Sequence, residues 1–221
     1  MSTAAFDRLK GACRNDWDAY ITHDFVRGIA RGDLPAAKFR HYLEQDYLFL
    51  IQFARAYALA IYKSDSLARM RQARGGLEAI LDIEIGLHID FCAGWGIGEE
   101  RLESIPEHPA CMAYTRYVLE RGMAGNLADL HMALAPCILG YGEVAQWILQ
   151  WPETRRDGNP YQAWIDMYSG DEYAEVAAAE SRMLDELTSE VTPDGQQWRS
   201  WEKTFAYATR LEVGFWDMGL E

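Results

Sequence analysis

One cysteine has a sequence context that suits chemistry: Cys137 directly follows Pro136, inside a segment that otherwise reads as a long apolar helix. Proline in a helix interior removes one backbone hydrogen bond and bends the helix axis. A thiol beside such a bend can project into a pocket and, once deprotonated, act as a nucleophile. Free cysteines are also commonly buried as small packing residues, so the local sequence leaves both interpretations open.

An acidic residue, Asp46, shares a helix face with aromatic residues. Tyr42 lies four residues before it, and Phe49 and Phe53 lie three and seven residues after it. Residues at these spacings project from one side of a helix. Burying a carboxylate without hydrogen bonds costs several kcal/mol. Asp46 is therefore expected to be either a structural acid with a buried partner or a residue that binds a ligand.

A second acid repeats this pattern near the end of the chain. Glu212 is the only acidic residue between Lys203 and Trp216, and Phe205, Phe215 and Trp216 lie near the same helix face. Two acids in two aromatic settings favour a functional site over two isolated structural acids.

A metal site is one alternative use of the polar residues. Glu84 and His88 are one helical turn apart and could bind a metal, as in the di-iron oxidases built from similar helices. Such a site also needs histidines or acids from later helices, and none of the five histidines follows His131. We therefore predict no metal and no cofactor, and His88 is interpreted as a hydrogen-bonded core residue.

A haem oxygenase would need an axial histidine near the N-terminus, for which His23 is the candidate. The next residue, Asp24, is of a type that commonly caps helices. His23 is therefore interpreted as structural.

The composition limits the possible partners. The chain has 221 residues, of which 49% are hydrophobic and 25% charged, as expected for one compact domain over residues 1–221. A net charge of −13 leaves no basic face for a nucleic acid. No uninterrupted apolar run approaches the roughly 20 residues that span a bilayer, so no membrane partner is expected.

The cysteines indicate a reducing compartment. They are far apart, form no CxxC pair, and no signal-peptide pattern is present at the N-terminus. We therefore expect reduced thiols in the cytoplasm. Cys13, Cys92 and Cys111 lack the proline context of Cys137 and are interpreted as packing residues.

The elements that must hold these residues are helices, because apolar residues recur at three- and four-residue spacing and hairpin signals are missing. The predicted class is all-α: a single-domain bundle of about eight to ten helices. In the first half, helices are expected over residues 6–20, 24–31, 35–62, a short stretch capped by Ser64 or Asp65, and 77–95 after a break at Gly75-Gly76. In the second half, they are expected over residues 109–122, 127–150 with Asn126 as the cap, a short stretch to 168, 171–187, and 193–218.

Four short motifs occur in this order along the chain: Gln45-Asp46 followed by Phe49 and Gln52-Phe53-Ala54; Ala135-Pro136-Cys137 followed by Tyr141 and Glu143-Val144; Tyr161-Gln162-Ala163-Trp164-Ile165 leading to Tyr168-Ser169-Gly170-Asp171; and Glu212 before Phe215-Trp216. Together they resemble the TenA family, the thiaminase II or aminopyrimidine aminohydrolase proteins of thiamin salvage. The resemblance covers most of the chain. It implies a haem-oxygenase-like all-helical fold and a homotetramer.

The resemblance also implies roles for individual residues. Cys137 matches the nucleophile of the family, Glu212 its acid/base residue, and Asp46 the carboxylate that hydrogen-bonds the aminopyrimidine. Phe49 stands where some members carry a tyrosine, which keeps a stacking ring and removes a hydroxyl. The tyrosines that match the walls of the pocket are Tyr114, Tyr141 and Tyr168.

The activity that the resemblance implies is hydrolysis of an aminomethylpyrimidine to hydroxymethylpyrimidine, with thiamin as another candidate substrate. The Cys137 thiolate would add to the ring while Glu212 takes its proton and returns it to the leaving group. The alternatives are a non-catalytic pyrimidine-binding or regulatory protein on the same fold, and a di-iron or haem-oxygenase-like oxidase. The presence of both Cys137 and Glu212 favours the hydrolase.

Overall fold

A computed structural model describes residues 3–192 and 194–221, and 80% of the chain is helical. The described residues form no strand, so the predicted all-α class is confirmed. The helices of the first half are α1 (Ala4–Ala12), α2 (Arg14–Ile21), α3 (Asp24–Arg31), α4 (Ala36–Lys63), α5 (Leu67–Glu78), the π-helical segment η1 (Ala79–Glu84) and α6 (Ile85–Ala93). Those of the second half are α7 (Glu99–Glu103), α8 (Pro109–Ala124), α9 (Leu127–Gln150), α10 (Gln162–Ser169), α11 (Asp171–Thr188) and α12 (Gln196–Gly219).

The centre of the bundle is α9, which packs against α8, α10, α11 and α12. Asn126 begins this helix with a capping box, as predicted, because its side chain accepts from the Asp129 N–H and the Asp129 carboxylate accepts from the Asn126 N–H. The helix continues through Pro136. Among the described residues, α9 alone is long and apolar enough to cross a membrane by length and composition, and 67% of its most apolar window is buried by the neighbouring helices.

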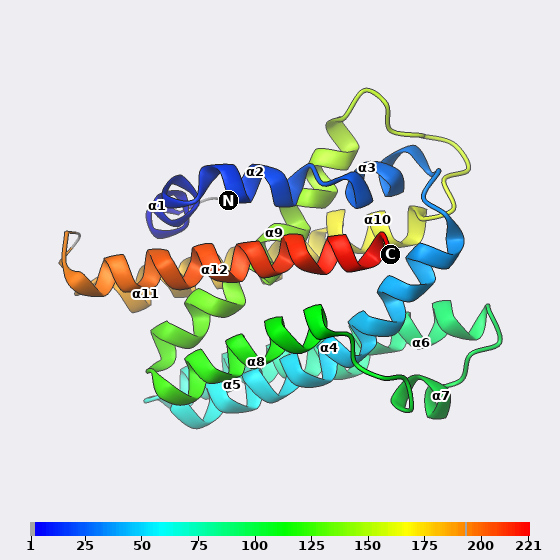
Figure 1. Cartoon of the computed structure of the whole chain (residues 1–221). Coiled ribbons are helices and arrows are strands. Elements are labelled where there is room, and N and C mark those ends of the chain that lie inside the picture. The colour runs from blue at the N-terminus through cyan, green and yellow to red at the C-terminus, as the bar shows by residue number, and fades with distance from the viewer. Residues whose placement is uncertain (1–2, 193) are drawn as a thin grey trace.

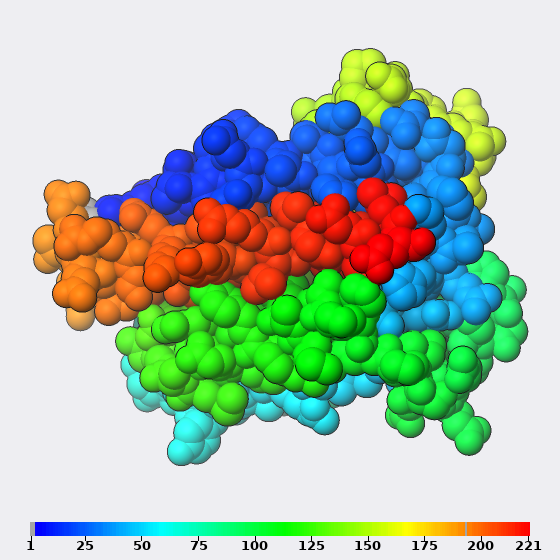
Figure 2. Space-filling model, in the orientation of Figure 1, coloured from blue at the N-terminus to red at the C-terminus, as the bar shows by residue number. Residues whose placement is uncertain are grey.

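The remaining helices form layers around α9. Helix α12 runs across the molecule between α2 and α3 on one side and α8 on the other, with α4 and α5 beyond α8 (Figure 1). The outer face of α12 stays at the surface between the N-terminal helices and α8 (Figure 2). Because α4 and α12 both pack on α8 and α9, the acids that these two long helices carry face the same interior.

Two predicted boundaries in the first half are wrong because single residues alter the backbone. The predicted helix 6–20 is interrupted at Cys13, whose φ of −132° and ψ of 36° end α1 and allow α2 to start in a new direction. The cap of α5 is Ser66, whose hydroxyl accepts from the Arg69 N–H, rather than Ser64 or Asp65. Ser64 instead donates to the Ala60 carbonyl at the end of α4.

The cap of α3 also differs from the prediction. His23, rather than Asp24, holds the cap position, and its Nδ1 accepts from the Phe25 N–H at 3.2 Å. Its Nε2 lies 3.1 Å from Asp217. The interpretation of His23 as a structural residue therefore holds through a different contact.

The predicted break at Gly75-Gly76 is absent, because α5 passes through both glycines and continues through η1 into α6. Gly76 packs against the Tyr57 ring so closely that a Cβ atom there would overlap the ring. The contact between α5 and α4 thus compensates for the conformational cost of glycine in a helix. The short helix α7 was not predicted. Pro193, the predicted start of the last helix, lies outside the described residues, and α12 begins at Gln196.

The two adjacent glycines should respond in opposite ways to alanine. Gly76→Ala should lower the free energy of unfolding by roughly 1–3 kcal/mol, because its Cβ would displace the Tyr57 ring. Gly75→Ala meets no atom within 4 Å and should leave stability unchanged or raise it by up to about 1 kcal/mol through helix propensity. Urea unfolding of both variants provides the measurement. Equal changes in the two would contradict the packing argument.

Candidate active site

Cys137 opens onto a cavity of about 120 Å³ that is lined by residues of α4, α5, η1, α9, α10 and α11. A water molecule needs roughly 10–15 Å³ of such space, so one small planar ring fits. The thiol is partly accessible from this cavity although protein surrounds it. The walls are mostly apolar, and the other lining residues near the thiol include Phe53, Tyr57, Glu84, Ile138 and Tyr173.

The surroundings keep the Cys137 thiol protonated in the empty protein. Burial raises its pKa well above the usual range, and the nearby carboxyl groups of Glu212, Glu84 and Asp46 raise it further. A neutral thiol is a weak nucleophile. Any reaction at Cys137 therefore needs a group that accepts the thiol proton or a ligand whose positive charge offsets the carboxylates.

Glu212 is the candidate for that group. It is 1% exposed on α12, and the Tyr114 hydroxyl on α8 donates to its Oε1 at 2.9 Å. Burial raises the pKa of Glu212 to about 8, although hydrogen bonding to Tyr114 and Cys137 lowers it. Near neutral pH this carboxyl group therefore exchanges its proton readily, as a general acid or base must.

Asp46 has a buried hydrogen-bonding partner, which a carboxyl group among aromatic side chains requires. Its Oδ2 lies 2.7 Å from His88 Nε2 and accepts from the Tyr42 hydroxyl at 2.9 Å. The other ring nitrogen, His88 Nδ1, lies 2.8 Å from the backbone carbonyl of Glu84 and must carry a hydrogen to donate there. A proton is therefore also shared between Nε2 and Oδ2.

This geometry favours an imidazolium–carboxylate pair. Burial by itself lowers the pKa of His88, but the hydrogen bond and charge of Asp46 raise it above its usual value. Tyr42 and His88 both occupy Oδ2, whereas no hydrogen bond to Oδ1 is found among the described residues. Oδ1 is thus the Asp46 oxygen without a hydrogen-bond partner in the described part of the chain, although the residue is buried outside the cavity lining.

Glu84 is the third carboxyl group of the site. It ends η1, and the Tyr168 hydroxyl on α10 donates to its Oε1 at 2.7 Å. Burial and the charge of Asp46 raise the pKa of Glu84 to about 7. π-Helical turns occur often at functional sites, and this one brings Glu84 to the cavity wall while its carbonyl orients His88.

Aromatic rings connect these polar groups. Phe49 packs on Tyr114 with ring centroids 5.1 Å apart, and Tyr141 packs on Tyr168 at 4.8 Å. The hydroxyls of Tyr141 and Tyr42 are 3.2 Å apart. Of the residues predicted for the site, only Cys137 lines the open cavity, and the others lie in the buried layer around it.

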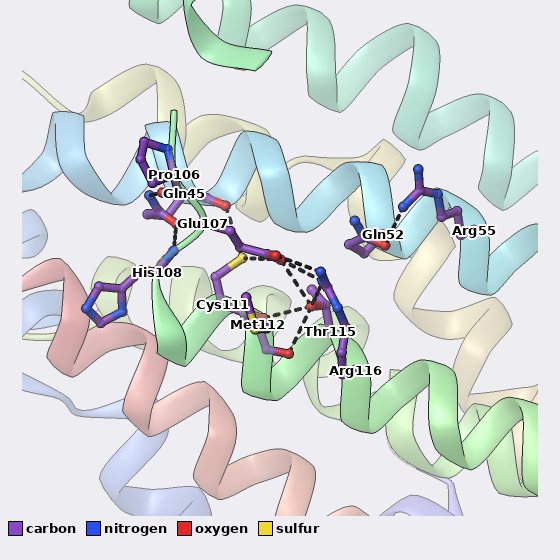
Figure 3. A network of polar contacts seen from close by, with 10 residues as sticks. All are labelled: Gln45, Gln52, Arg55, Pro106, Glu107, His108, Cys111, Met112, Thr115 and Arg116. Carbon is purple, nitrogen blue, oxygen red and sulfur yellow. Dashed lines mark hydrogen bonds and ion pairs between the residues drawn. The ribbon is translucent and has the colours of Figure 1, made fainter. Parts of the chain in front are cut away.

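A network beside the site fixes α8 to α4 (Figure 3). The Gln45 amide group donates to the Pro106 carbonyl at 3.1 Å, and its oxygen accepts from the His108 N–H at 2.7 Å. Glu107 pairs with Arg116 at 2.7 Å. Gln45 directly precedes Asp46 on α4, and α8 carries Tyr114. These contacts therefore fix the distance between the Asp46 carboxyl group and the Tyr114 hydroxyl that donates to Glu212.

Some members of the site were not predicted. From the sequence, His88 is interpreted as a hydrogen-bonded core residue. The four-residue spacing of Glu84 and His88 alone is not enough to predict a metal site. The described residues contain no group of three or more side chains that could hold a metal ion. The sequence did not indicate Tyr20 on α2 either. Its hydroxyl is buried and lies beside Glu212, whose pKa it lowers through a hydrogen bond, and its ring fills the space above Gly140.

The sequence matches a known family over nearly its whole length. Residues 12–221 match the model of the TENA/THI-4/PQQC family. An uncharacterized protein of Haemophilus influenzae is 45% identical over 206 residues, which are 93% of this chain and 94% of that protein. An aminopyrimidine aminohydrolase of Halalkalibacterium halodurans is 36% identical over 202 residues, or 91% of this chain and 89% of that relative.

Solved structures agree with the fold. A TenA family transcription regulator from a Silicibacter species matches with a TM-score of 0.92 and 41% identity, covering 98% of this chain and 96% of that chain. A domain with a haem-oxygenase-like fold from Shewanella denitrificans has a TM-score of 0.74 at 16% identity, covering 97% and 91%. The second match concerns the fold alone and confirms the predicted haem-oxygenase-like architecture.

The buried carboxyl of Glu212 should make stability depend on pH. Between its usual pKa and about 8, the folded protein holds a proton that the unfolded chain releases, so the free energy of unfolding falls as pH rises. Glu212→Gln removes this titration and should gain stability relative to wild type between about pH 5 and about pH 8.5. Denaturant unfolding at the two pH values measures the difference. The exposed control Glu186→Gln should not show it.

Proposed function

The chain belongs to the TENA/THI-4/PQQC family, and from this premise we propose that it is a hydrolase of thiamin salvage. The substrate class is 5-aminomethyl-substituted 4-aminopyrimidines, which include 4-amino-5-aminomethyl-2-methylpyrimidine, and thiamin is a second candidate. The observation that carries the proposal is the position of the Cys137 thiol at a cavity, coupled to the Glu212 carboxyl behind it. The aminopyrimidine aminohydrolase relative supports this substrate class.

Binding would use the buried acid and the aromatic layer. A 4-aminopyrimidine has N–H donors on its edge and apolar faces, so it requires an anionic acceptor between aromatic walls. Asp46 supplies the acceptor through Oδ1, and Phe49, Tyr114, Tyr141 and Tyr168 supply rings of the buried aromatic layer, in which Tyr114 donates to Glu212. Because Phe49 has no hydroxyl, it contributes stacking alone.

In the proposed reaction the Cys137 sulfur forms a bond to a ring carbon while the thiol proton passes to the Glu212 carboxylate. The leaving amine departs from the exocyclic methylene and takes the proton from Glu212. Water then adds to the methylene and gives one proton to the Glu212 carboxylate. The sulfur–carbon bond breaks as this proton returns to the sulfur, which releases the thiol and hydroxymethylpyrimidine. A positively charged substrate helps the first step, since its charge lowers the pKa of both Cys137 and Glu212.

A second candidate is a pyrimidine-binding regulatory protein, because the Silicibacter relative is described as a transcription regulator. The net charge of −13 opposes direct contact with DNA. We also propose, from the family resemblance, a cytoplasmic homotetramer. Apolar side chains near one end of the bundle are available for self-association: Tyr62, Leu67 and Met123 are 83%, 60% and 67% exposed.

Removing the nucleophile should abolish turnover while sparing binding. Cys137→Ala should lower kcat by roughly three orders of magnitude or more, because no other thiol of the described chain lines the cavity. The measurement is release of ammonia from 4-amino-5-aminomethyl-2-methylpyrimidine, with pyrimidine affinity measured by calorimetry. Cys92→Ala, the same change at a buried packing thiol, should retain turnover. Activity of Cys137→Ala at the wild-type level would refute the covalent mechanism.

Asp46 should act mainly on affinity. Asp46→Asn removes the anionic acceptor and should weaken pyrimidine binding by roughly ten- to hundredfold, the usual value of a hydrogen bond to a charged group. Titration of the Cys137→Ala protein with and without this change isolates binding from chemistry. Asp90→Asn, on the exposed side of the helix that carries His88, is the control. Unchanged affinity in Asp46→Asn would remove Asp46 from the binding site.

A further inference from the structure

The proposed reaction leaves one carboxyl group of the cavity wall unused. Glu84 lines the cavity together with Cys137, whereas Glu212 and Asp46 are buried outside this lining. The other carboxyl group of the lining, Glu172, is exposed on α11. Glu84 is therefore the half-buried carboxyl group that a molecule in the cavity meets beside the thiol.

The hydrogen bonds of Glu84 leave one carboxyl oxygen for a ligand or a water molecule. The Tyr168 hydroxyl donates to Oε1 at 2.7 Å, and no hydrogen bond to Oε2 is found within residues 3–192 and 194–221. Burial and the charge of Asp46 raise the pKa of Glu84 to about 7, so part of it is ionised near neutral pH. An ionised carboxylate is an acceptor only. Oε2 thus suits an O–H donor in the cavity.

One histidine ties the position of Glu84 to that of Asp46. His88 is fully buried, its Nδ1 lies 2.8 Å from the Glu84 carbonyl, and its Nε2 lies 2.7 Å from Asp46 Oδ2. The π-helical segment η1 ends at Glu84, so the side chain reaches the cavity wall while the backbone carbonyl meets His88. A pyrimidine held by Asp46 would therefore have a fixed position relative to the Glu84 carboxyl, and such positioning accelerates a reaction between two molecules.

We propose that Glu84 holds the water molecule that replaces the departing amine. The inference rests on the proposed function, because it assumes that a pyrimidine joined to Cys137 has already lost its amine. Glu212 supplies the proton to that amine, so the carboxyl group on the cavity side is left for the incoming water. One O–H of this water donates to Glu84 Oε2 and the other is directed to Glu212, which turns an oxygen lone pair toward the methylene.

The atoms and electrons of this step balance. The water oxygen bonds to the methylene carbon, and the double bond between the methylene and the ring returns its electron pair to the ring. One water proton passes to Glu212 and then to the Cys137 sulfur as the sulfur–carbon bond breaks. The other proton stays on the oxygen as the product hydroxyl, which still donates to Glu84.

Glu84→Gln tests a role that begins only after the amine has left. The amide oxygen of glutamine can accept from Tyr168, but its NH₂ group is a donor and cannot hold a water O–H. Rapid mixing with excess 4-amino-5-aminomethyl-2-methylpyrimidine should release one equivalent of ammonia in a burst, followed by turnover roughly a hundredfold slower than in wild type. Mass spectrometry of the acid-quenched protein should show the pyrimidine adduct accumulating on Cys137.

The matched control is Asp82→Asn, which removes an exposed carboxylate from the same π-helical segment. It should turn over like wild type and accumulate no adduct. Glu84→Asp keeps the charge and shortens the side chain, so it should show the same burst with a smaller loss of turnover. This second variant carries the test if the glutamine variant does not fold.

Two results would overturn this inference and leave the proposed function standing. One is turnover at the wild-type level in the Glu84 variants, and the other is slow ammonia release without a burst or an adduct, which would indicate a structural role or an earlier step. No ammonia release by the wild-type protein would refute the proposed function and this inference with it.

Discussion

The burial of three carboxyl groups around one thiol is the constraint on which the rest of the site depends. Each would be unstable in an apolar interior without a partner, and each has a different one. Asp46 accepts from Tyr42 and pairs with His88, Glu84 accepts from Tyr168, and Glu212 accepts from Tyr114. These different partners give the three carboxyl groups different environments, and environment sets the part that each acid can take in a reaction.

These partners couple the site to the packing of the whole bundle. The acids come from α4, η1 and α12, and the groups that satisfy them come from α4, α6, α8 and α10. Removing any one helix would leave a buried charge or hydroxyl unpaired, which costs more than the lost apolar contact alone. Tyr20 adds a further donor beside Glu212, and the buried indole N–H of Trp216, which packs on Tyr141, has no hydrogen-bond partner among the described residues. The position of this N–H suits a site that completes its hydrogen bonds with a ligand.

Local sequence rules predicted the class and much of the site framework. The cap at Asn126, the starts of α4 and α8 near their prolines, and the aromatic face around Asp46 depend on residues close in sequence. The break at Cys13, the continuity through Gly76 and the partner of Asp46 depend on residues far apart. His88 is 42 positions from Asp46, so no local pattern could show that the two side chains share a proton. The cavity at Cys137 likewise exists only where α4, α5, η1, α9, α10 and α11 meet.

The π-helical segment η1 also bears on how the chain tolerates change in length. A π turn holds about one residue more than an α turn of similar rise. Loss of one residue between Ala79 and Glu84 would return this region to a regular α-helix and leave α5 close to its present rotation relative to α6. Gly76 would then stay against Tyr57, and Glu84 and His88 would keep their spacing. A single codon deletion in this short stretch would therefore be absorbed within η1 and alter the cavity wall only there.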